Sequence, residues 1–312
     1  ARFDRSPEIW ERENGLNSTL RPPLSVIACA ALLMSWMAGG TVQASIVTDD
    51  PTHWNLTFSD EFSGSTLDGT KWANRLPGVR NSAINTADAV SVGGGVLTIT
   101  TYTDAGTTYT GMIGSQGKFE QTYGYFEARM KFNSAPAEWS AFWLTSPVFD
   151  GHVGDPATYG TEIDIVEHRM VNGNDKDISN KYVSSVHWDG YGAEHKQVST
   201  TSAAQAGLGN GSWHTYALKW SPAGYEFFYD DTSLWVVTDA VSARPEYMIL
   251  SSEVRDANWA GTLPTGGYGS LGSSTTNVQV DYVHVYSAVP EPAAIGVIAA
   301  MPALALRRPR RW

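Results

Sequence analysis

Short apolar or alternating runs recur along residues 53–287, and Gly, Pro, Asn or Asp separates each run from the next. A period of two is typical of β-strands, and no stretch of this region follows the helical period of about 3.6 residues. Because about a dozen strands follow one another without a long linker, the pattern predicts a single all-β domain folded as a two-sheet β-sandwich. The predicted strands are residues 54–58, 96–101, 124–132, 140–145, 162–167, 182–188, 214–220, 225–229, 233–237, 247–253 and 278–286.

The N-terminal part of the chain has a different pattern. Residues 24–38 form an apolar run after Arg21, and small residues follow at Val42 and Ala44. This order is typical of a secretory signal peptide cleaved after Ala44, so we expect residues 1–44 to be an upstream extension followed by a signal peptide. The alternative is a buried core helix, which the Gly-Gly pair and polar residues directly after the run disfavour.

The C-terminal residues 289–312 combine a Val-Pro-Glu-Pro motif, an apolar stretch at 293–306 and a final Arg-Arg-Pro-Arg-Arg-Trp cluster. The apolar stretch is shorter than the roughly 20 residues that span a bilayer. The three parts in this order resemble the PEP-CTERM sorting signal of Gram-negative bacteria, which an exosortase cleaves near the Pro-Glu-Pro motif. The resemblance implies export to the cell surface or the extracellular matrix. The alternative to a sorting signal is that the basic cluster serves only as a cytoplasmic stop signal.

Charge and cysteine content limit the partners of the central domain. Residues 45–287 hold 13 Lys and Arg against 27 Asp and Glu, so this region is more acidic than the whole chain, whose net charge is −11. Basic surfaces drive binding to nucleic acid, anionic lipid and sulfated polymers, so we expect a neutral partner and no nucleic acid. The single cysteine, Cys29, excludes an internal disulfide framework. We expect a monomer.

Three carboxylates lie close together in the Gly-Thr-Glu-Ile-Asp-Ile-Val-Glu segment at residues 160–167. Strand alternation places Glu162 and Asp164 on one face and Ile163 on the other, and Glu167 joins the first face only if a β-bulge absorbs one residue. No Lys or Arg stands between these acids, so their mutual repulsion raises at least one pKa, as general acid catalysis requires. With a bulge, two Glu side chains could approach the roughly 5 Å separation of retaining glycosidases. The alternative is a solvated strand edge with ordinary surface acids.

Several motifs surround these acids in a fixed order. They are Phe-Ser-Asp-Glu-Phe at 58–62, Tyr-Gly-Tyr-Phe-Glu-Ala-Arg at 123–129, Trp-Ser-Ala-Phe-Trp-Leu at 139–144, Trp-His-Thr-Tyr at 213–216 and Val-Asp-Tyr-Val-His-Val-Tyr at 280–286. Together with the acidic segment they resemble glycoside hydrolase family 16, and the resemblance spans nearly all of the domain expected at residues 45–288. It implies a concanavalin-like β-jelly roll with a concave substrate cleft. The E-x-D-x-x-E spacing resembles the laminarinase, agarase and carrageenase branches.

The resemblance also implies roles for the three acids. The residue that matches Glu162 is the nucleophile of a retaining mechanism, and the one that matches Glu167 is the acid/base. The residue that matches Asp164 holds the hydrogen bonds and charge of the nucleophile. Family members often have Pro where Ser140 stands, so this chain departs from the pattern there.

Aromatic side chains are the expected sugar platforms, because the C–H faces of a pyranose ring stack on indole and phenol rings. The candidates are Trp139, Trp143, Trp188 and Trp259. For each of them the alternative is a core aromatic, and for Trp143 that alternative is nearly as good. Trp139 resembles the cleft tryptophan of the family.

Polar candidates for substrate binding are His187, Glu127 and Arg129. His187 is similar to the family's cleft histidine near the acid/base, although it could be a satisfied strand histidine. Glu127 and Arg129 are expected on the cleft face of a neighbouring strand, paired with each other or with the catalytic acids. A purely structural role for these two charged residues is an equally good alternative to a role in the cleft.

The resemblance implies a structural calcium ion on the convex face of the sandwich. Glu61, Asp281 and a carbonyl group near Gly94 match the family's positions, and calcium prefers such hard oxygen ligands. The alternative for both carboxylates is an ordinary surface role. No cofactor is expected for catalysis.

The sequence therefore predicts a secreted, retaining endo-β-glycanase that hydrolyses β-1,3-glucan or mixed-linkage β-glucan. The acidic domain disfavours sulfated galactans, but a galactan hydrolase of the agarase or carrageenase type stays open. A non-catalytic carbohydrate-binding surface protein is the other alternative, because fold does not fix function. The complete set of three carboxylates argues against it, since a pure binder has no need of two Glu at this spacing.

Overall fold

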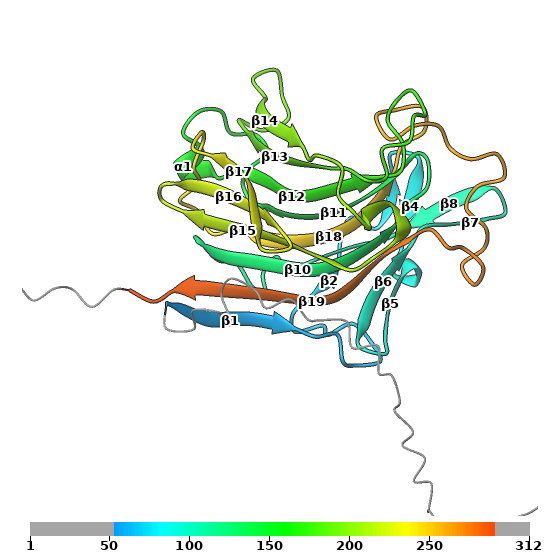
Figure 1. The fold of residues 1–312 in the computed structure, drawn as a ribbon, viewed down its shortest axis with the longest axis horizontal. Helices are drawn as coiled ribbons and strands as arrows, with labels where there is room; N and C mark the ends of the chain where they lie inside the picture. The colour runs from blue at the N-terminus through cyan, green and yellow to red at the C-terminus, as the bar shows by residue number, and fades with distance from the viewer. Residues whose placement is uncertain (1–52, 291–312) are drawn as a thin grey trace, which may run out of the picture. The chain divides into compact units, whose positions relative to one another are not determined.

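The computed structural model describes residues 53–290, which form β-strands joined by turns. Two antiparallel sheets lie face to face (Figure 1), and this confirms the predicted all-β sandwich. The helical parts are one turn of α-helix, α1 (Pro156–Tyr159), and two 3₁₀ turns, η1 (Ala87–Ala89) and η2 (Leu208–Asn210). None of the helices in this part of the chain is long and apolar enough to cross a membrane.

One sheet has eight strands. In spatial order they are β17 (Thr232–Val237), β16 (Gly224–Tyr229), β15 (His214–Ser221), β10 (Gly124–Asn133), β19 (Asn277–Ala288), β6 (Val96–Thr100) and β5 (Val90–Gly93), and β1 (Trp54–Asp60) also pairs with β19.

The other large sheet has seven strands, and it carries the candidate site. Its order is β14 (Lys196–Thr201), β13 (Tyr182–Trp188), β12 (Glu162–Arg169), β11 (Glu138–Thr145), β18 (Tyr247–Val254), β9 (Met112–Gly114) and β2 (Ala73–Asn74). A third, four-stranded sheet has the order β3 (Gly78–Arg80), β4 (Ala83–Asn85), β8 (Thr107–Thr110) and β7 (Tyr102–Asp104), with β4 and β8 parallel.

All eleven predicted strands are present, each with boundaries within a few residues of the prediction. The strands that the pattern missed are β2, β3, β4, β5, β7, β8, β9 and β14. Most of these have two to four residues, which is too short for alternation to be read, and β14 is polar except for Val198. The predicted signal peptide, and the apolar and basic parts of the predicted sorting tail, lie outside the described residues.

The main core fills the space between the two large sheets. Strand alternation sends Phe126 of β10 and Val283 of β19 inward from one side, and Phe142 of β11 and Leu250 of β18 inward from the other. All four side chains are fully buried. Because every second residue of β11 and β18 is oriented in this way, the side chains between them face outward from the seven-stranded sheet.

Candidate active site

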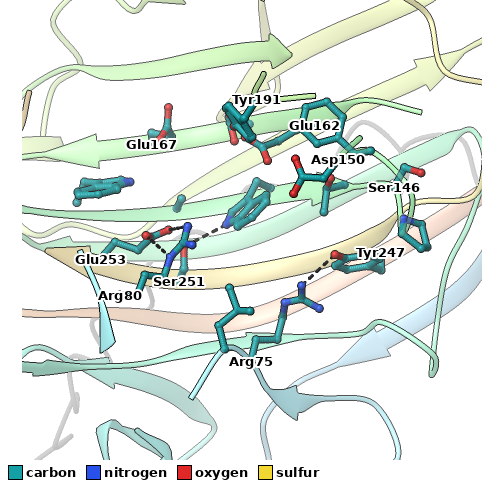
Figure 2. Close-up of a pocket in the computed structure, with 18 residues that line it drawn as sticks. Arg75, Arg80, Ser146, Asp150, Glu162, Glu167, Tyr191, Tyr247, Ser251 and Glu253 are labelled. Atoms are coloured by element: carbon teal, nitrogen blue, oxygen red, sulfur yellow. Dashed lines mark hydrogen bonds and ion pairs between the residues drawn. The ribbon is translucent and has the colours of Figure 1, made fainter. Parts of the chain in front are cut away.

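A cavity of about 400 Å³ lies over the outer face of the seven-stranded sheet. Its floor comes from β12, β11 and β18, which are neighbours in the sheet, and Figure 2 shows their side chains pointing into one space. Across this floor, Trp143 of β11 pairs with Asp164 of β12 on one side and Ile249 of β18 on the other. The next cleft-facing row places small side chains, Ala141 and Ser251, beside Glu167.

The predicted β-bulge in β12 is present. Asp164 pairs with Trp143 of β11, whereas Val166 pairs with the adjacent Phe142, so Ile165 between them has no partner on that strand. The register against β13 shifts in the same interval. A bulge of one residue turns the strand by one position. It therefore brings Glu167 to the cleft face, where Glu167 lines the same cavity as Glu162 and Asp164.

The two glutamates of this strand have raised pKa values. Burial raises the pKa of Glu162 well above its usual value, the charge of Asp164 raises it further, and a hydrogen bond from Tyr191 opposes both effects. Burial and then the charges of Asp164 and Glu162 raise the pKa of Glu167 in the same direction. Like charges that share a desolvated site cannot all ionise together. This arrangement favours one protonated and one ionised carboxyl group, the pairing that acid-assisted displacement requires.

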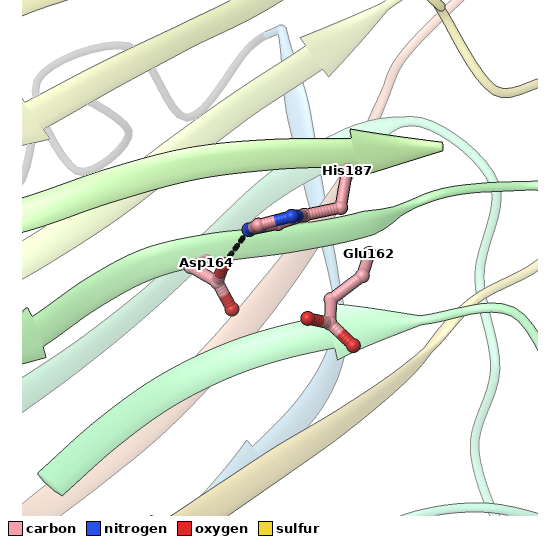
Figure 3. Close-up of side chains that lie close together, drawn as sticks. All are labelled: Glu162, Asp164 and His187. Atoms are coloured by element: carbon pink, nitrogen blue, oxygen red, sulfur yellow. Dashed lines mark ion pairs between the residues drawn. The ribbon is translucent and has the colours of Figure 1, made fainter. Parts of the chain in front are cut away.

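His187 contacts the middle acid of this group. Its Nε2 lies 3.1 Å from Asp164 Oδ2, as Figure 3 shows. Its Nδ1 lies 2.9 Å from His195 Nε2. Potential ligand atoms of Glu162, Asp164 and His187 all lie within 4.8 Å of one another, so these residue types could hold a metal ion. In the structure, however, the imidazole of His187 already joins Asp164 to His195. Trp188, the next residue of β13, alternates to the opposite face and does not line the cavity.

Two of the predicted aromatic platforms lie in the cleft. Trp139 and Trp143 are half-buried residues of β11 that line the cavity, and Trp143 Nε1 donates a hydrogen bond to Ser251 Oγ at 3.1 Å. Trp259 is not part of the cavity lining, but its ring meets that of Trp139 edge to face at 5.6 Å. The guanidinium of Arg169 lies 4.1 Å from the centre of the Trp259 ring. Trp259 therefore contacts Trp139, and Arg169 in turn contacts Trp259.

The prediction that Glu127 and Arg129 face the cleft is wrong. Both lie on β10, which belongs to the eight-stranded sheet, and they point outward from it because Ala128 between them is buried in the core. Tyr282 Oη donates a hydrogen bond to Glu127 Oε1 at 2.8 Å, and Arg129 Nη1 lies 2.6 Å from Asp281 Oδ2. Alternation predicted that the two charges share a face, but it could not predict on which sheet that face lies.

The three residues predicted to bind calcium lie around the eight-stranded sheet. Glu61 directly follows β1, Gly94 lies in the turn between β5 and β6, and Asp281 is on β19, which pairs with both β1 and β6. Glu61 Oε1 lies 2.5 Å from His284 Nε2, and Asp281 has Arg129 as its partner. Within residues 53–290, one oxygen of each carboxylate accepts no hydrogen bond from a side chain. Those oxygens fit a hard cation, and the calcium site stays a prediction.

Sequence reasoning missed several cleft residues that come from other strands and loops. Arg80 forms a two-pronged ion pair with Glu253, with Nε to Oε2 at 2.6 Å and Nη2 to Oε1 at 3.2 Å. Arg75 donates to Tyr247 Oη at 3.0 Å, as Figure 2 shows. Tyr191 donates a hydrogen bond to Glu162. Of these, only Tyr191 had a local signal, since it lies four residues after His187 in the His-Trp-Asp-Gly-Tyr-Gly segment.

Comparison with known proteins identifies relatives with this fold. Endo-1,3-1,4-β-glycanase EglC of Rhizobium meliloti is 31% identical over 248 residues, which make up 76% of this chain and 47% of that protein. A β-glucanase of Rhodothermus marinus is 30% identical over 224 residues, or 65% of this chain and 72% of the relative. The chain thus spans less than half the length of the first of these relatives.

Solved structures also resemble this chain. Porphyranase B of Zobellia galactanivorans superposes with a TM-score of 0.61 at 27% identity, over 76% of this chain and 93% of that one. The laminarinase of Rhodothermus marinus gives a TM-score of 0.60 at 25% identity, over 76% of this chain and 98% of that one. The family model described as "Beta-porphyranase A-D, GH16 domain" matches residues 53–288, most of the chain. The chain therefore belongs to glycoside hydrolase family 16.

Proposed function

We propose that this protein is a retaining endo-β-glycanase. The observation that carries the proposal is the bulged strand β12, which presents Glu162, Asp164 and Glu167 to one cavity while Ile163, Ile165 and Val166 fill the core. Most glycoside hydrolases use two carboxyl groups, one on either side of the glycosidic bond that is cleaved. Trp139 and Trp143 beside them supply apolar faces against which a sugar ring can stack.

The roles of the acids follow from their environment. Glu162, as nucleophile, attacks the anomeric carbon, and protonated Glu167 gives its proton to the leaving oxygen. The covalent glycosyl–enzyme is then hydrolysed by a water molecule that Glu167, now ionised, deprotonates. The charge of Asp164 raises the pKa of both glutamates. His187 orients Asp164, since its Nε2 lies 3.1 Å from Asp164 Oδ2.

A neutral β-1,3-glucan or mixed-linkage β-glucan is the substrate that we favour. The two curated relatives described above are named as β-glucan or β-glycan hydrolases. The cleft is also rich in negative charge, because Asp150 lines it together with the three acids of β12. Such a cleft repels an anionic chain. The guanidinium of Arg80 offsets this little, since it is already paired with Glu253.

A sulfated galactan is the second candidate substrate, and Arg75 is the observation that favours it. Arg75 lines the cavity, and no carboxylate of residues 53–290 lies within ion-pair distance of it. Its guanidinium lies 4.6 Å from the centre of the Tyr247 ring. An arginine without an acidic partner can bind a sulfate ester. The family model is named for porphyranases, and one relative, 28% identical, is a keratan-sulfate endo-1,4-β-galactosidase of Sphingobacterium multivorum.

We also propose that the protein is exported. The apolar segment with its small-residue site before Ser45 and the Pro-Glu-Pro, apolar and basic segments at the other end support cleavage at both ends. The mature form is then a domain at the cell surface or in the extracellular matrix. A structural calcium ion bound near Glu61, Gly94 and Asp281 is the third part of the proposal.

The first prediction concerns the catalytic pair. Glu162→Gln and Glu167→Gln should each lower kcat by several orders of magnitude, because each removes a group that acts in the transition state. The circular dichroism spectrum should not change. Glu226→Gln makes the same chemical change on β16, outside the cleft, and should leave kcat as it is. Retention of more than about a tenth of the activity in either cleft variant would refute the role given to that residue.

The second prediction separates the substrate classes. Reducing ends should be released fastest from laminarin or lichenan in a panel that also contains agarose, carrageenan, xyloglucan, porphyran and keratan sulfate. Release from the sulfated galactans alone, with a loss of that activity in Arg75→Met, would establish the second candidate instead. No release from any of these glycans would contradict the proposed glycanase.

The third prediction tests the calcium ion. Chelation with EGTA should lower the melting temperature and readdition of Ca²⁺ should restore it, because an ion that binds only the folded state stabilises that state. Activity at 25 °C should persist, since the proposed ligands lie on the eight-stranded sheet and not in the cleft. An unchanged melting temperature together with a metal analysis that finds no calcium would exclude the site.

The fourth prediction tests export. Mass spectrometry of the protein exported by its native host should find a chain of about residues 45–290, which lacks both terminal segments. The mature protein should also be more acidic than its precursor, because the ends carry eight of the 21 basic residues. An intact Arg-Arg-Pro-Arg-Arg-Trp end on the exported protein would show that the tail is not cleaved.

A further inference from the structure

The loop between β13 and β14 brings Tyr191 onto the carboxylate of Glu162. Tyr191 Oη donates a hydrogen bond to Glu162 Oε1, and Figure 2 shows the phenol ring beside this carboxylate at the edge of the cavity. Within residues 53–290, no other side chain donates a hydrogen bond to Glu162. Among these residues, one side chain thus donates a hydrogen bond to Glu162, the proposed nucleophile, and that side chain comes from a loop.

This loop is held firmly at its first two residues. Asp189 is buried, accepts a hydrogen bond from the backbone N–H of Gly154 at 2.8 Å, and lies 2.7 Å from Lys196 Nζ. Gly190 has a φ of +64°, and a Cβ there would lie 3.3 Å from the backbone nitrogen of Gly151. Only glycine accepts this conformation and approach without strain. The loop is therefore fixed against the chain segment that follows β11.

The ring of Tyr191 is supported on several sides. It meets Phe149 edge to face at 5.4 Å, and it lies 4.9 Å from the ring of His195 and 5.9 Å from that of His187. Tyr191 is 56% exposed, but these ring contacts lie on the side where its hydroxyl meets Glu162, and they favour that orientation. His187 also contacts Asp164, and His195 contacts His187, so the two acids share these supporting residues.

The phenol acts as a donor throughout the working pH range of such an enzyme. Burial, and next the charge of Glu162, raise the pKa of the Tyr191 hydroxyl above its usual value. A protonated hydroxyl that faces a carboxylate favours the ionised form of that carboxylate. It lowers the pKa of Glu162, against burial and the repulsion of Asp164. Within residues 53–290 no side chain donates a hydrogen bond to Glu167, and the charge of Arg169 opposes the rise of its pKa instead, so the hydrogen bond of Tyr191 acts on one of the two acids only.

We propose that Tyr191 is a positioning residue, which orients the Glu162 carboxylate for attack on the anomeric carbon and keeps it ionised while Glu167 stays protonated. This inference rests on the proposed glycanase function. It adds a residue from a loop to a mechanism otherwise built on strands. It also explains why an exposed loop carries a tyrosine whose polar end points into the cleft.

The test uses Tyr191→Phe, which keeps the ring and its contacts and removes only the hydroxyl. Loss of a hydrogen bond to a charged group should lower kcat/KM about ten- to a hundredfold, with most of the loss in kcat. Without the donor the pKa of Glu162 rises. The acidic limb of the kcat/KM profile, which follows ionisation of the nucleophile in the free enzyme, should therefore move to higher pH.

Tyr247→Phe is the matched control in the same cleft. Its hydroxyl accepts a hydrogen bond from Arg75 and, within residues 53–290, donates none to a carboxylate, so its removal should leave the acidic limb in place, whatever its effect on KM. A Tyr191→Phe enzyme with an unmoved limb, or with a limb moved to lower pH, would overturn the proposal, even if kcat/KM fell.

A measurement without substrate separates this inference from the proposed function. The ¹³C signal of the Glu162 carboxyl carbon, assigned by its loss in Glu162→Gln, is titrated in the wild-type protein and in Tyr191→Phe. A higher pKa of Glu162 in the variant supports the role of Tyr191, even if no glycan in the panel is cleaved. Equal titration curves refute it, even if the protein is an active glycanase.

Discussion

The chemistry of the cleft depends on a single unpaired residue in β12. Without the bulge at Ile165, strict alternation would turn Glu167 into the core and expose Val166, an exchange of a carboxylate for an apolar side chain in a fully packed interior. With it, Ile163, Ile165 and Val166 are all buried and the three acids share one face. The core on the inner face thus fixes the geometry of the reacting groups on the outer face, and packing and catalysis constrain the same eight residues.

Placing three acids on one strand face creates a repulsion that the neighbouring elements must contain. The three acids are stabilised in different ways: Asp164 contacts His187, Glu162 accepts a hydrogen bond from Tyr191, and half-buried Glu167 is favoured in its protonated form. Glu253 adds a further negative charge, but Arg80 holds it in a two-pronged ion pair. These partners come from β13, the following loop and the strand β3. The protonation states needed for the reaction are therefore a property of the assembled cleft and not of β12 alone.

The outer faces of the two large sheets carry different kinds of side chain. The seven-stranded sheet carries the acids and the tryptophans on its outer face, whereas the outer face of the eight-stranded sheet carries internally paired charges such as Arg129 with Asp281. The misplacement of Glu127 and Arg129 shows why the sequence could not separate these two faces. Their strand β10 has the same alternating pattern as the catalytic strand, and membership of one sheet or the other is decided by long-range pairing with β15 and β19.

From its sequence alone, this protein is determined to be an all-β sandwich with an acidic strand that needs a bulge, because period-two alternation and carboxylate spacing are local properties of the chain. The roles of Glu162, Asp164 and Glu167 could be proposed at that level, and so could Trp139 and Trp143 as cleft aromatics. Only the tertiary structure decided that Tyr191, Arg75 and Arg80 reach the same cavity and that Trp188 does not. Arg75 and Arg80 lie more than 80 residues before Glu162, next to β2 and at the end of β3, and Tyr191 lies in the loop after β13. Their positions depend on strand order and on loop conformations such as the turn at Gly190, and no periodicity along the chain encodes either of them.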